Sequence, residues 1–434
     1  MYGSSGLELF KKPPVQTAIL RNYENDYYPI QTISEDGPIE FVLKGSQNEY
    51  IDVSDVNLYI KFKITDSTGG DLSFAAPAGG TTPDKVSVEN LAIATLFQDV
   101  SLTLGTTQIE GGHYMYPYAS YLSVVTQFTQ QAKKTHLAAA GWYADTADKF
   151  NSETENKGHA ARKIINNKSR EIIGPVFLDF FRQNRYLLPD VSLSLKFTRA
   201  KPAFVIQTFD TTKTNYKIKI EEAILYVRRV EISPSLVNMH NSRLDNKMNA
   251  LYPVQHTEIQ TFTINKGLHS HIEDRLFRGL MPKLLYVCMV ENDAFNGDIT
   301  KNPFHFQQFN LNKIALYREG EYATHPPLEP NFTDNQYFRS YALTQRALGM
   351  YNTDDSNGLT LEDFAKGYGI YVFDLTADSS PSGDHIQSEQ TGNLRIDLKF
   401  KSALSTTINV ILYAVFDGNI EITKLRNVIP SYLR

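Results

Sequence analysis

The sequence predicts an all-β protein of two consecutive jelly-roll β-sandwiches, a double jelly roll with a few short inserted helices. Segments in both halves alternate apolar and polar residues, which is the period of a strand with one buried face. Each half also runs in the same order of strands, one helix and three further strands. Finally, a motif occurs twice: Leu195-Lys196-Phe197 is followed by Ile224-Leu225-Tyr226, and Leu398-Lys399-Phe400 is followed by Ile411-Leu412-Tyr413.

The spacing of the two motif copies indicates where the halves differ. The copies lie 203 residues apart at the first element and 187 apart at the second, so the connection is 16 residues longer in the first half. We expect residues 201–215 to be an elaboration of the first jelly roll, and the two motif pairs to lie on equivalent strands of a duplicated domain.

Length and charge restrict the class of protein. A chain of 434 residues exceeds what one hydrophobic core usually serves, and its 25 Phe and 25 Tyr favour strands. The net charge is −5, from 43 basic and 48 acidic residues. Because this balance gives no overall positive field to neutralise phosphates, we expect no sequence-specific nucleic-acid binding.

The cysteine count and the apolar runs suggest a protein of a reducing compartment. The single cysteine, Cys288, lies in an apolar run and is predicted to be a buried small hydrophobe. No apolar stretch approaches the roughly 20 residues needed to span a bilayer. Met1–Phe10 lacks the basic segment and apolar core of a secretory signal. We therefore expect no membrane-spanning segment and a protein that is made inside the cell and not secreted.

The first half is predicted to contain an arm and one sandwich. Residues 1–35 mix prolines, charges and aromatics without a period of 2 or 3.6, so we expect an extended N-terminal arm. The first jelly roll is predicted at 36–232. Its expected elements are strands at 39–43 and 56–64, a long loop at 66–90, strands within 94–109, a helix over 114–128, and strands at 172–181, 193–197 and 216–232.

The second half is predicted to repeat this plan after a helical linker at 233–252. Ser233 suits a helix N-cap and Pro234 suits the first helical position. The second jelly roll is predicted at 253–424, with a C-terminal tail at 425–434. Its expected elements are strands at 257–264, 283–290 and within 304–317, a helix over 337–348, and strands at 368–375, 394–400 and 408–422. The helices are too few for a parallel α/β fold, whereas paired sandwiches bury many strands.

A search for catalytic or metal chemistry yields two candidates, and neither meets the requirements of its class. His269 and His271 would share one face of a strand, with Glu273 beside them, but the spacing does not match the metal motif of the cupins. The acidic loop 354–358 fails as an EF-hand, because Phe364 stands where the twelfth-position carboxylate is required. We therefore predict no catalytic residue, no metal site, no cofactor and no enzymatic activity.

Short segments along nearly the whole chain resemble, in order, the major capsid proteins of Maverick/Polinton elements and the related adintoviruses. In the first half these segments are Leu9-Phe10 through Gln16-Thr17, Gly37-Pro38-Ile39-Glu40-Phe41, Glu49-Tyr50-Ile51-Asp52-Val53 and Tyr116-Pro117-Tyr118-Ala119-Ser120-Tyr121-Leu122. In the second half they are Glu291-Asn292-Asp293-Ala294-Phe295-Asn296-Gly297, Lys301-Asn302-Pro303-Phe304, Tyr317 with Gly320-Glu321, Lys366-Gly367-Tyr368, Phe373-Asp374-Leu375-Thr376 and Gln390 with Gly392-Asn393-Leu394-Arg395.

This resemblance implies a structural capsid protein. It implies that two jelly rolls stand side by side in each chain, that three chains form a pseudo-hexagonal homotrimer, and that trimers tile an icosahedral shell around double-stranded DNA. The implied partners are other copies of the chain and a penton or minor capsid protein, and the implied location is the virion capsid. The residues themselves leave one alternative open, a soluble two-domain β-sandwich module whose aromatic-rich loops bind carbohydrate.

Overall fold

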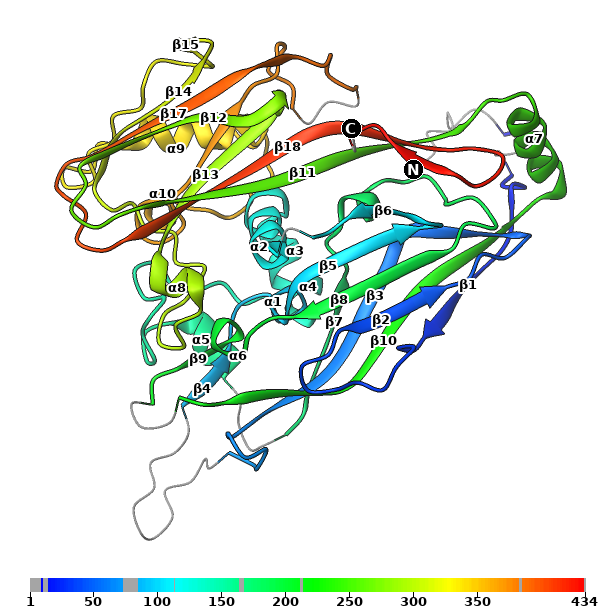
Figure 1. Ribbon diagram of the computed structural model, residues 1–434, viewed down its shortest axis with the longest axis horizontal. Helices are drawn as coiled ribbons and strands as arrows, with labels where there is room; N and C mark the ends of the chain where they lie inside the picture. Colours follow the sequence, from blue (N-terminus) through cyan, green and yellow to red (C-terminus); the bar gives the residue numbers. More distant parts are fainter. Residues whose placement is uncertain are drawn as a thin grey trace.

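The computed structural model describes residues 9–10, 15–72, 85–112, 114–163, 168–210, 214–381 and 385–432. Two β-sandwiches lie side by side, one from each half of the chain, and the helix α2 (Tyr116–Gln127) lies between them (Figure 1). The fold class is as predicted: mostly strands, all pairings between named strands antiparallel, and short helices inserted in the connections.

The first sandwich consists of two four-stranded sheets, which we call sheets I and II. Sheet I has the order β1-β10-β3-β7 and sheet II the order β2-β8-β5-β6. Their strands are β1 (Ile19–Tyr27), β2 (Ile39–Leu43), β3 (Glu49–Thr65), β5 (Phe97–Leu104), β6 (Thr107–Glu110), β7 (Arg170–Pro175), β8 (Leu193–Arg199) and β10 (Lys217–Ile232). A small additional sheet pairs β4 (Val86–Val88) with β9 (Ile206–Thr208).

The second sandwich repeats the same strand order in sheets III and IV. Sheet III has the order β11-β18-β13-β16 and sheet IV the order β12-β17-β14-β15. Their strands are β11 (Ala250–Ile264), β12 (Ser270–Leu280), β13 (Leu284–Glu291), β14 (Leu311–Arg318), β15 (Glu321–Tyr322), β16 (Ile370–Asp374), β17 (Thr391–Phe400) and β18 (Ile408–Ile422). If the eight main strands of each half are numbered along the chain, both halves have sheets of order 1-8-3-6 and 2-7-4-5, which is the arrangement of a jelly roll.

The repeated sequence motif lies on equivalent strands, as predicted. Leu195-Lys196-Phe197 is on β8 and Leu398-Lys399-Phe400 on β17, the seventh main strand of each half. The two Ile-Leu-Tyr runs are on β10 and β18, the eighth main strands. The longer first-half connection at 201–215 contains the short helix α6 (Pro202–Val205) and β9, apart from residues 211–213, which lie outside the described residues.

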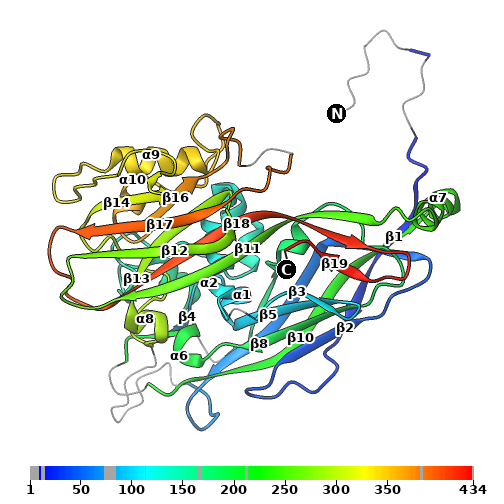
Figure 2. The ribbon, with the colours of Figure 1, turned by 45° about the horizontal axis from the view of Figure 1, so that its top comes forward.

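Helices fill the connections between strands. The three helices predicted from the sequence are α2, α7 (Pro234–Asp245) and α9 (Phe338–Ala347); α7 lies at the far end of the first sandwich (Figure 2). The others are α1 (Ala92–Thr95), α3 (Gln130–Lys134), α4 (His136–Ala139), α5 (Lys157–Arg162), α8 (Asn292–Asn296), α10 (Leu361–Ala365) and the 3₁₀ helix η1 (Asp179–Arg182). The single helix expected in the first half is thus accompanied by several one-turn helices, which are too short to show a helical period. Within the described part of the chain, no helix has both the length and the apolarity to cross a membrane.

Both chain ends contribute strands that the sequence did not predict. The arm predicted at 1–35 is corrected over Ile19–Tyr27, which forms β1 and pairs with β10 along the edge of sheet I. Its alternating burial is weak because its outward side chains are polar. In the predicted tail, β19 (Val428–Pro430) folds back and pairs with β18. Residues 1–8 and 11–14 lie outside the described residues.

The hydrophobic core is continuous between the two sandwiches. One cluster lies between sheets III and IV. A larger cluster fills the first sandwich and extends to the opposite face of sheet III, where it includes Leu284, Tyr286, Cys288 and Val290. Sheet III is therefore buried on both faces, and the two jelly rolls form one packed body.

Candidate functional site

The candidate site is the buried interface between the two jelly rolls, which we call the seam. Strand β13 shows how it forms, since seven consecutive residues from Leu284 to Val290 are buried. Side chains alternate across a strand, so Leu285 and Val287 enter the core of the second sandwich while Tyr286 and Cys288 face the first. An apolar run with no polar alternation is what a strand buried on both faces requires.

Aromatic rings join the first sandwich to the second. The ring of Tyr121 on α2 stacks on Phe304 with centroids 4.1 Å apart and planes 5° apart. Tyr118, one turn earlier, packs against Phe304 at 5.6 Å and stacks on Phe295 of α8 at 5.6 Å. The aromatic stripe of α2 therefore packs against residues far away in the sequence, because the helix reaches beyond its own sandwich.

A buried lysine adds a polar connection across the seam. Lys133 Nζ donates to the carbonyl oxygen of Val125 at 2.6 Å and to that of Asn357, in the other half, at 2.6 Å. Burial lowers the pKa of Lys133 to about 7, opposed in part by the charge of Asp363. The amine of Lys133 can donate to both carbonyl oxygens whether it is charged or neutral. Lys133 therefore positions the loop around Asn357 against α2 and α3.

A fully buried ion pair supports the same region from inside the first sandwich. Arg162 Nη2 lies 2.7 Å from Asp145 Oδ1, with side-chain exposures of 1% and 0%. Arg162 also donates to the carbonyl oxygens of Val88 and Tyr143. Because nearly every polar atom of the pair has a partner, the pair can be kept in an apolar surrounding.

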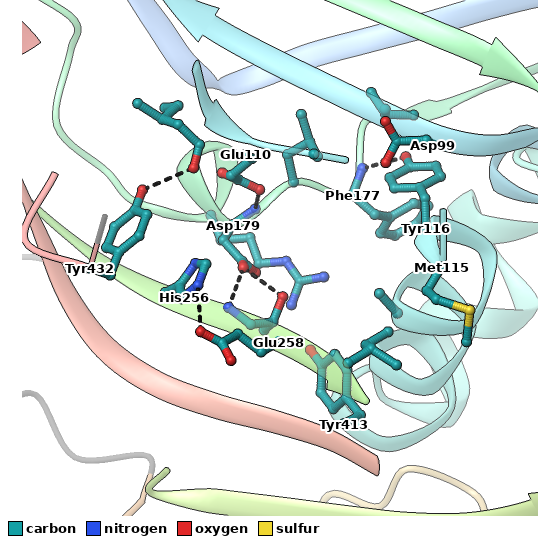
Figure 3. Close-up of a pocket in the computed structure, with 18 of the residues that line it drawn as sticks. Asp99, Glu110, Met115, Tyr116, Phe177, Asp179, His256, Glu258, Tyr413 and Tyr432 are labelled. Carbon is teal, nitrogen blue, oxygen red and sulfur yellow. Dashed lines mark hydrogen bonds and ion pairs between the residues drawn. The ribbon is translucent and has the colours of Figure 1, made fainter. Parts of the chain in front are cut away.

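A cavity of about 280 Å³ at the seam is lined by residues of both halves (Figure 3). Glu110 and Asp179 come from the first half, and His256 and Tyr432 from the second. The Glu110 carboxylate accepts the backbone N–H groups of Asp179 at 2.8 Å and Phe180 at 2.6 Å. Asp179 Oδ2 in turn accepts the N–H of Thr257 at 2.8 Å, which ties η1 to β11.

Electrostatics at this cavity favour a protonated carboxyl group. Burial, followed by the nearby charge of Asp179, raises the pKa of Glu110 to about 8. The His256 ring stacks on Tyr432 with centroids 4.2 Å apart. The Tyr432 hydroxyl donates to the carbonyl oxygen of Ile109 on β6 at 3.4 Å, so the C-terminal segment contacts the first sandwich. The Thr257 hydroxyl also donates to Asp179 Oδ2 at 2.7 Å, so this carboxylate connects the two halves through two hydrogen bonds.

The structure does not gather the predicted metal candidates into a ligand set. His271 Nε2 lies 3.0 Å from Glu273 Oε2 on β12, and its ring stacks on Phe262. His269 precedes the strand and is exposed. Among the described residues, no group of three or more His, Cys, Asp or Glu side chains could hold a metal ion.

The acidic loop and the cysteine have structural roles. Gly358 has a φ of +78°, and Thr360 then caps α10 in a capping box with Asp363, so the loop is a turn ahead of a helix. Asp354 and Asp355 are exposed. Cys288 is fully buried in β13, as predicted, and burial raises the pKa of its thiol.

Sequence reasoning did not identify the seam. The fully apolar run of β13, compared with the alternating run of its counterpart β3, was an available signal for a doubly buried strand. Lys133 and Asn357 carried no local signal, because their contact joins positions 224 residues apart.

The sequence and the structure were compared with those of known proteins. No family model matches the sequence. The chain is 23% identical over 396 residues to the uncharacterized protein F54H12.2 of Caenorhabditis elegans, covering 90% of this chain and 93% of that protein.

Several solved structures of viral proteins are similar to this chain along almost its whole length. A chain of the Sputnik virophage cryo-EM structure matches with a TM-score of 0.67 and 13% identity, covering 99% of this chain and 92% of that one. The chain has the double jelly-roll fold. The mavirus major capsid protein matches with a TM-score of 0.57 and 10% identity over 99% and 94% of the two chains. The Faustovirus major capsid protein matches with a TM-score of 0.58 and 8% identity over 96% and 92%. The mavirus and Faustovirus proteins are major capsid proteins, which are structural proteins and not enzymes.

Proposed function

We propose that this chain is a structural major capsid protein, which forms homotrimeric capsomers that tile an icosahedral shell around double-stranded DNA. The observation that carries the proposal is the match along almost the whole chain to viral major capsid proteins, including that of mavirus. The resemblance of the short motifs to Maverick/Polinton and adintovirus capsid proteins supports a place in that group. A penton or minor capsid protein at the vertices is the further partner that this function requires.

The internal construction of the chain supports a role in a shell wall. Two jelly rolls with the same strand order are joined into one packed body by sheet III and α2. Three such chains provide six similar sandwiches, so a threefold assembly can fill a hexagonal position. In this function the protein acts by burying surface between copies.

The oligomeric state of the purified protein tests the proposal. Size-exclusion chromatography with light scattering is expected to give a particle of three times the 49.1 kDa chain mass. Negative-stain microscopy at high concentration is expected to show hexagonal plates or shells. A monomer at all concentrations would exclude the capsid function, and a monomer that binds immobilised glycans would favour the carbohydrate-binding module instead.

A further inference from the structure

A second cavity at the seam has a volume of about 400 Å³. Its lining comes from α2, α3, α4 and α5 of the first half and from residues 357–368 of the second half. Val125, Asn357 and Tyr368 are buried residues of this lining, whereas Lys134 and Lys157 are exposed, so the cavity extends from the seam to the surface. Sites for small molecules commonly have this volume and are concave in this way.

Lys133 is a buried charged residue of the lining whose hydrogen-bonding capacity is not filled. Its side chain belongs to a residue that is only 9% exposed, and Nζ donates to the carbonyl oxygens of Val125 and Asn357 at 2.6 Å each. An ammonium group carries three donors. In the part of the chain that the structure describes, no third acceptor lies within hydrogen-bonding distance of Nζ. One donor of Lys133 is therefore available to a ligand in the cavity.

The other charges of the lining favour a negatively charged group. Lys134 of α3 and Lys157 of α5 are basic and exposed. The two carboxylates already have partners, since Asp145 lies 2.7 Å from Arg162 and Asp363 completes the capping box of α10. Because the lysines outnumber the carboxylates and the carboxylates are occupied, the cavity attracts an anion.

The remaining walls of the cavity are apolar. Val125, Ala138, Trp142 and Leu359 line it. The ring centroid of Trp142 lies 5.8 Å from Lys133 Nζ, a distance at which an aromatic face stabilises a cation. A bare inorganic anion would leave these apolar side chains in contact with water. The lining therefore fits a ligand that has an apolar body as well as an anionic group.

We propose that this cavity binds a small amphipathic anion, a molecule that carries one carboxylate or sulfonate group on an apolar body. The anionic group accepts the free donor of Lys133, and the apolar body packs against Trp142 and Leu359. A ligand in this position contacts both jelly rolls, so its binding stabilises the seam. The site does not depend on the capsid function proposed above.

The protonation of Lys133 makes binding at this site depend on pH. Burial lowers the pKa of Lys133 to about 7, and the charge of Asp363 opposes this shift. The other charged and titratable groups that line or adjoin the cavity are Lys134, Lys157, Tyr143, Tyr368, Asp145 and Arg162. Because the anion binds the charged amine, its affinity should fall by about tenfold as pH rises from about 6 to 8.

Trp142 reports on the occupancy of the cavity, because it is the one tryptophan of the chain and lies in the lining. The probe is anilinonaphthalene sulfonate, an amphipathic anion that accepts energy from a nearby excited tryptophan. We expect the probe to quench the emission of Trp142 in the full chain. Octanoate should displace the probe, and octanol, which has the same chain without the charge, should do so at least about tenfold less well. Unquenched emission at saturating probe, or equal displacement by the two compounds, would overturn the proposal.

Substitutions of the exposed lysines test the site without changing the carbonyl bonds of Lys133. Lys134→Gln combined with Lys157→Gln should weaken binding of the probe by roughly two- to fivefold. Lys399→Gln is the matched control, since Lys399 is exposed on β17 outside the cavity, and it should leave the affinity unchanged. Equal affinities in the double variant and the control would count against the proposed site.

Lys133→Met tests the recognition of the anion directly. It should weaken binding of the probe by roughly tenfold or more and abolish the pH dependence, with circular dichroism checking the fold. Unchanged affinity in this variant would overturn the proposal. If the variant does not fold, the wild-type protein still decides, because an affinity that stays constant between about pH 6 and 8 is incompatible with binding through Lys133.

Discussion

Truncation of Tyr121 is expected to weaken both jelly rolls at once. Tyr121 is fully buried on α2, its ring stacks on Phe304 of the second half, and the Trp142 ring lies 5.3 Å away. Tyr121→Ala removes a ring from a closely packed seam and leaves a cavity. Replacement of a large buried aromatic by alanine typically costs about 3–5 kcal/mol. We expect a loss of this size in the free energy of unfolding.

The measurement combines urea unfolding with hydrogen exchange. Because one core cluster extends from the first sandwich to sheet III, amides of β3 and of β13 should both exchange faster in Tyr121→Ala. Tyr351→Ala is the control, since Tyr351 is 52% exposed and its removal should change stability by less than about 0.5 kcal/mol. Faster exchange in β3 with unchanged exchange in β13 would show that the two sandwiches open independently, and the single-body argument would fail.

Three further predictions concern buried groups. Burial raises the pKa of Glu110 to about 8 in the folded protein, so between pH 5 and 8 this carboxyl group is protonated when folded and ionised when unfolded. The free energy of unfolding should therefore fall as pH rises from 5 to 8, by at most about 1.4 kcal/mol per pH unit. Urea midpoints across this range measure the slope, and Glu110→Gln should remove it. Arg162→Met should cost about 3–5 kcal/mol in thermal unfolding, because it leaves Asp145 buried without its counter-charge; unchanged stability would contradict the structural role of this ion pair. Gly367→Ala should cost roughly 3 kcal/mol by urea unfolding, because φ is +121° and a Cβ would lie 2.3 Å from the buried Phe150 ring; wild-type stability would contradict that clash.

The repeated motif made much of the fold predictable. Leu195-Lys196-Phe197 on β8 and its second copy on β17 lie on equivalent inner strands of sheets II and IV. In both copies the leucine and the phenylalanine are buried and the lysine is exposed. The aromatic stripe at helical spacing located α2, and Ser233-Pro234 located the start of α7. These signals are local, so they survive without any knowledge of tertiary contacts.

Features that depend on tertiary contact were missed. Strand β1 reads as an irregular arm, because an edge strand with polar outward side chains needs the neighbouring β10 to become a strand. The seam was also missed, because Lys133 and Asn357 meet only after both halves have folded. Short helices such as α3 and α8 are fixed by packing and caps rather than by periodicity.

A comparison between the repeats carries information that neither repeat carries alone. Strands β3 and β13 are equivalent, yet β3 alternates from Val56 to Ile64 whereas β13 is apolar throughout. The inward side chains match, so the difference lies entirely on the outward face. Sheet III is apolar on its outward face because the first jelly roll covers that face within the same chain. Sheet I carries Lys61 and half-buried tyrosines on its outward face, as expected of side chains that remain in contact with water. The position at which the two halves stop matching therefore marks the sheet face that is buried between the jelly rolls.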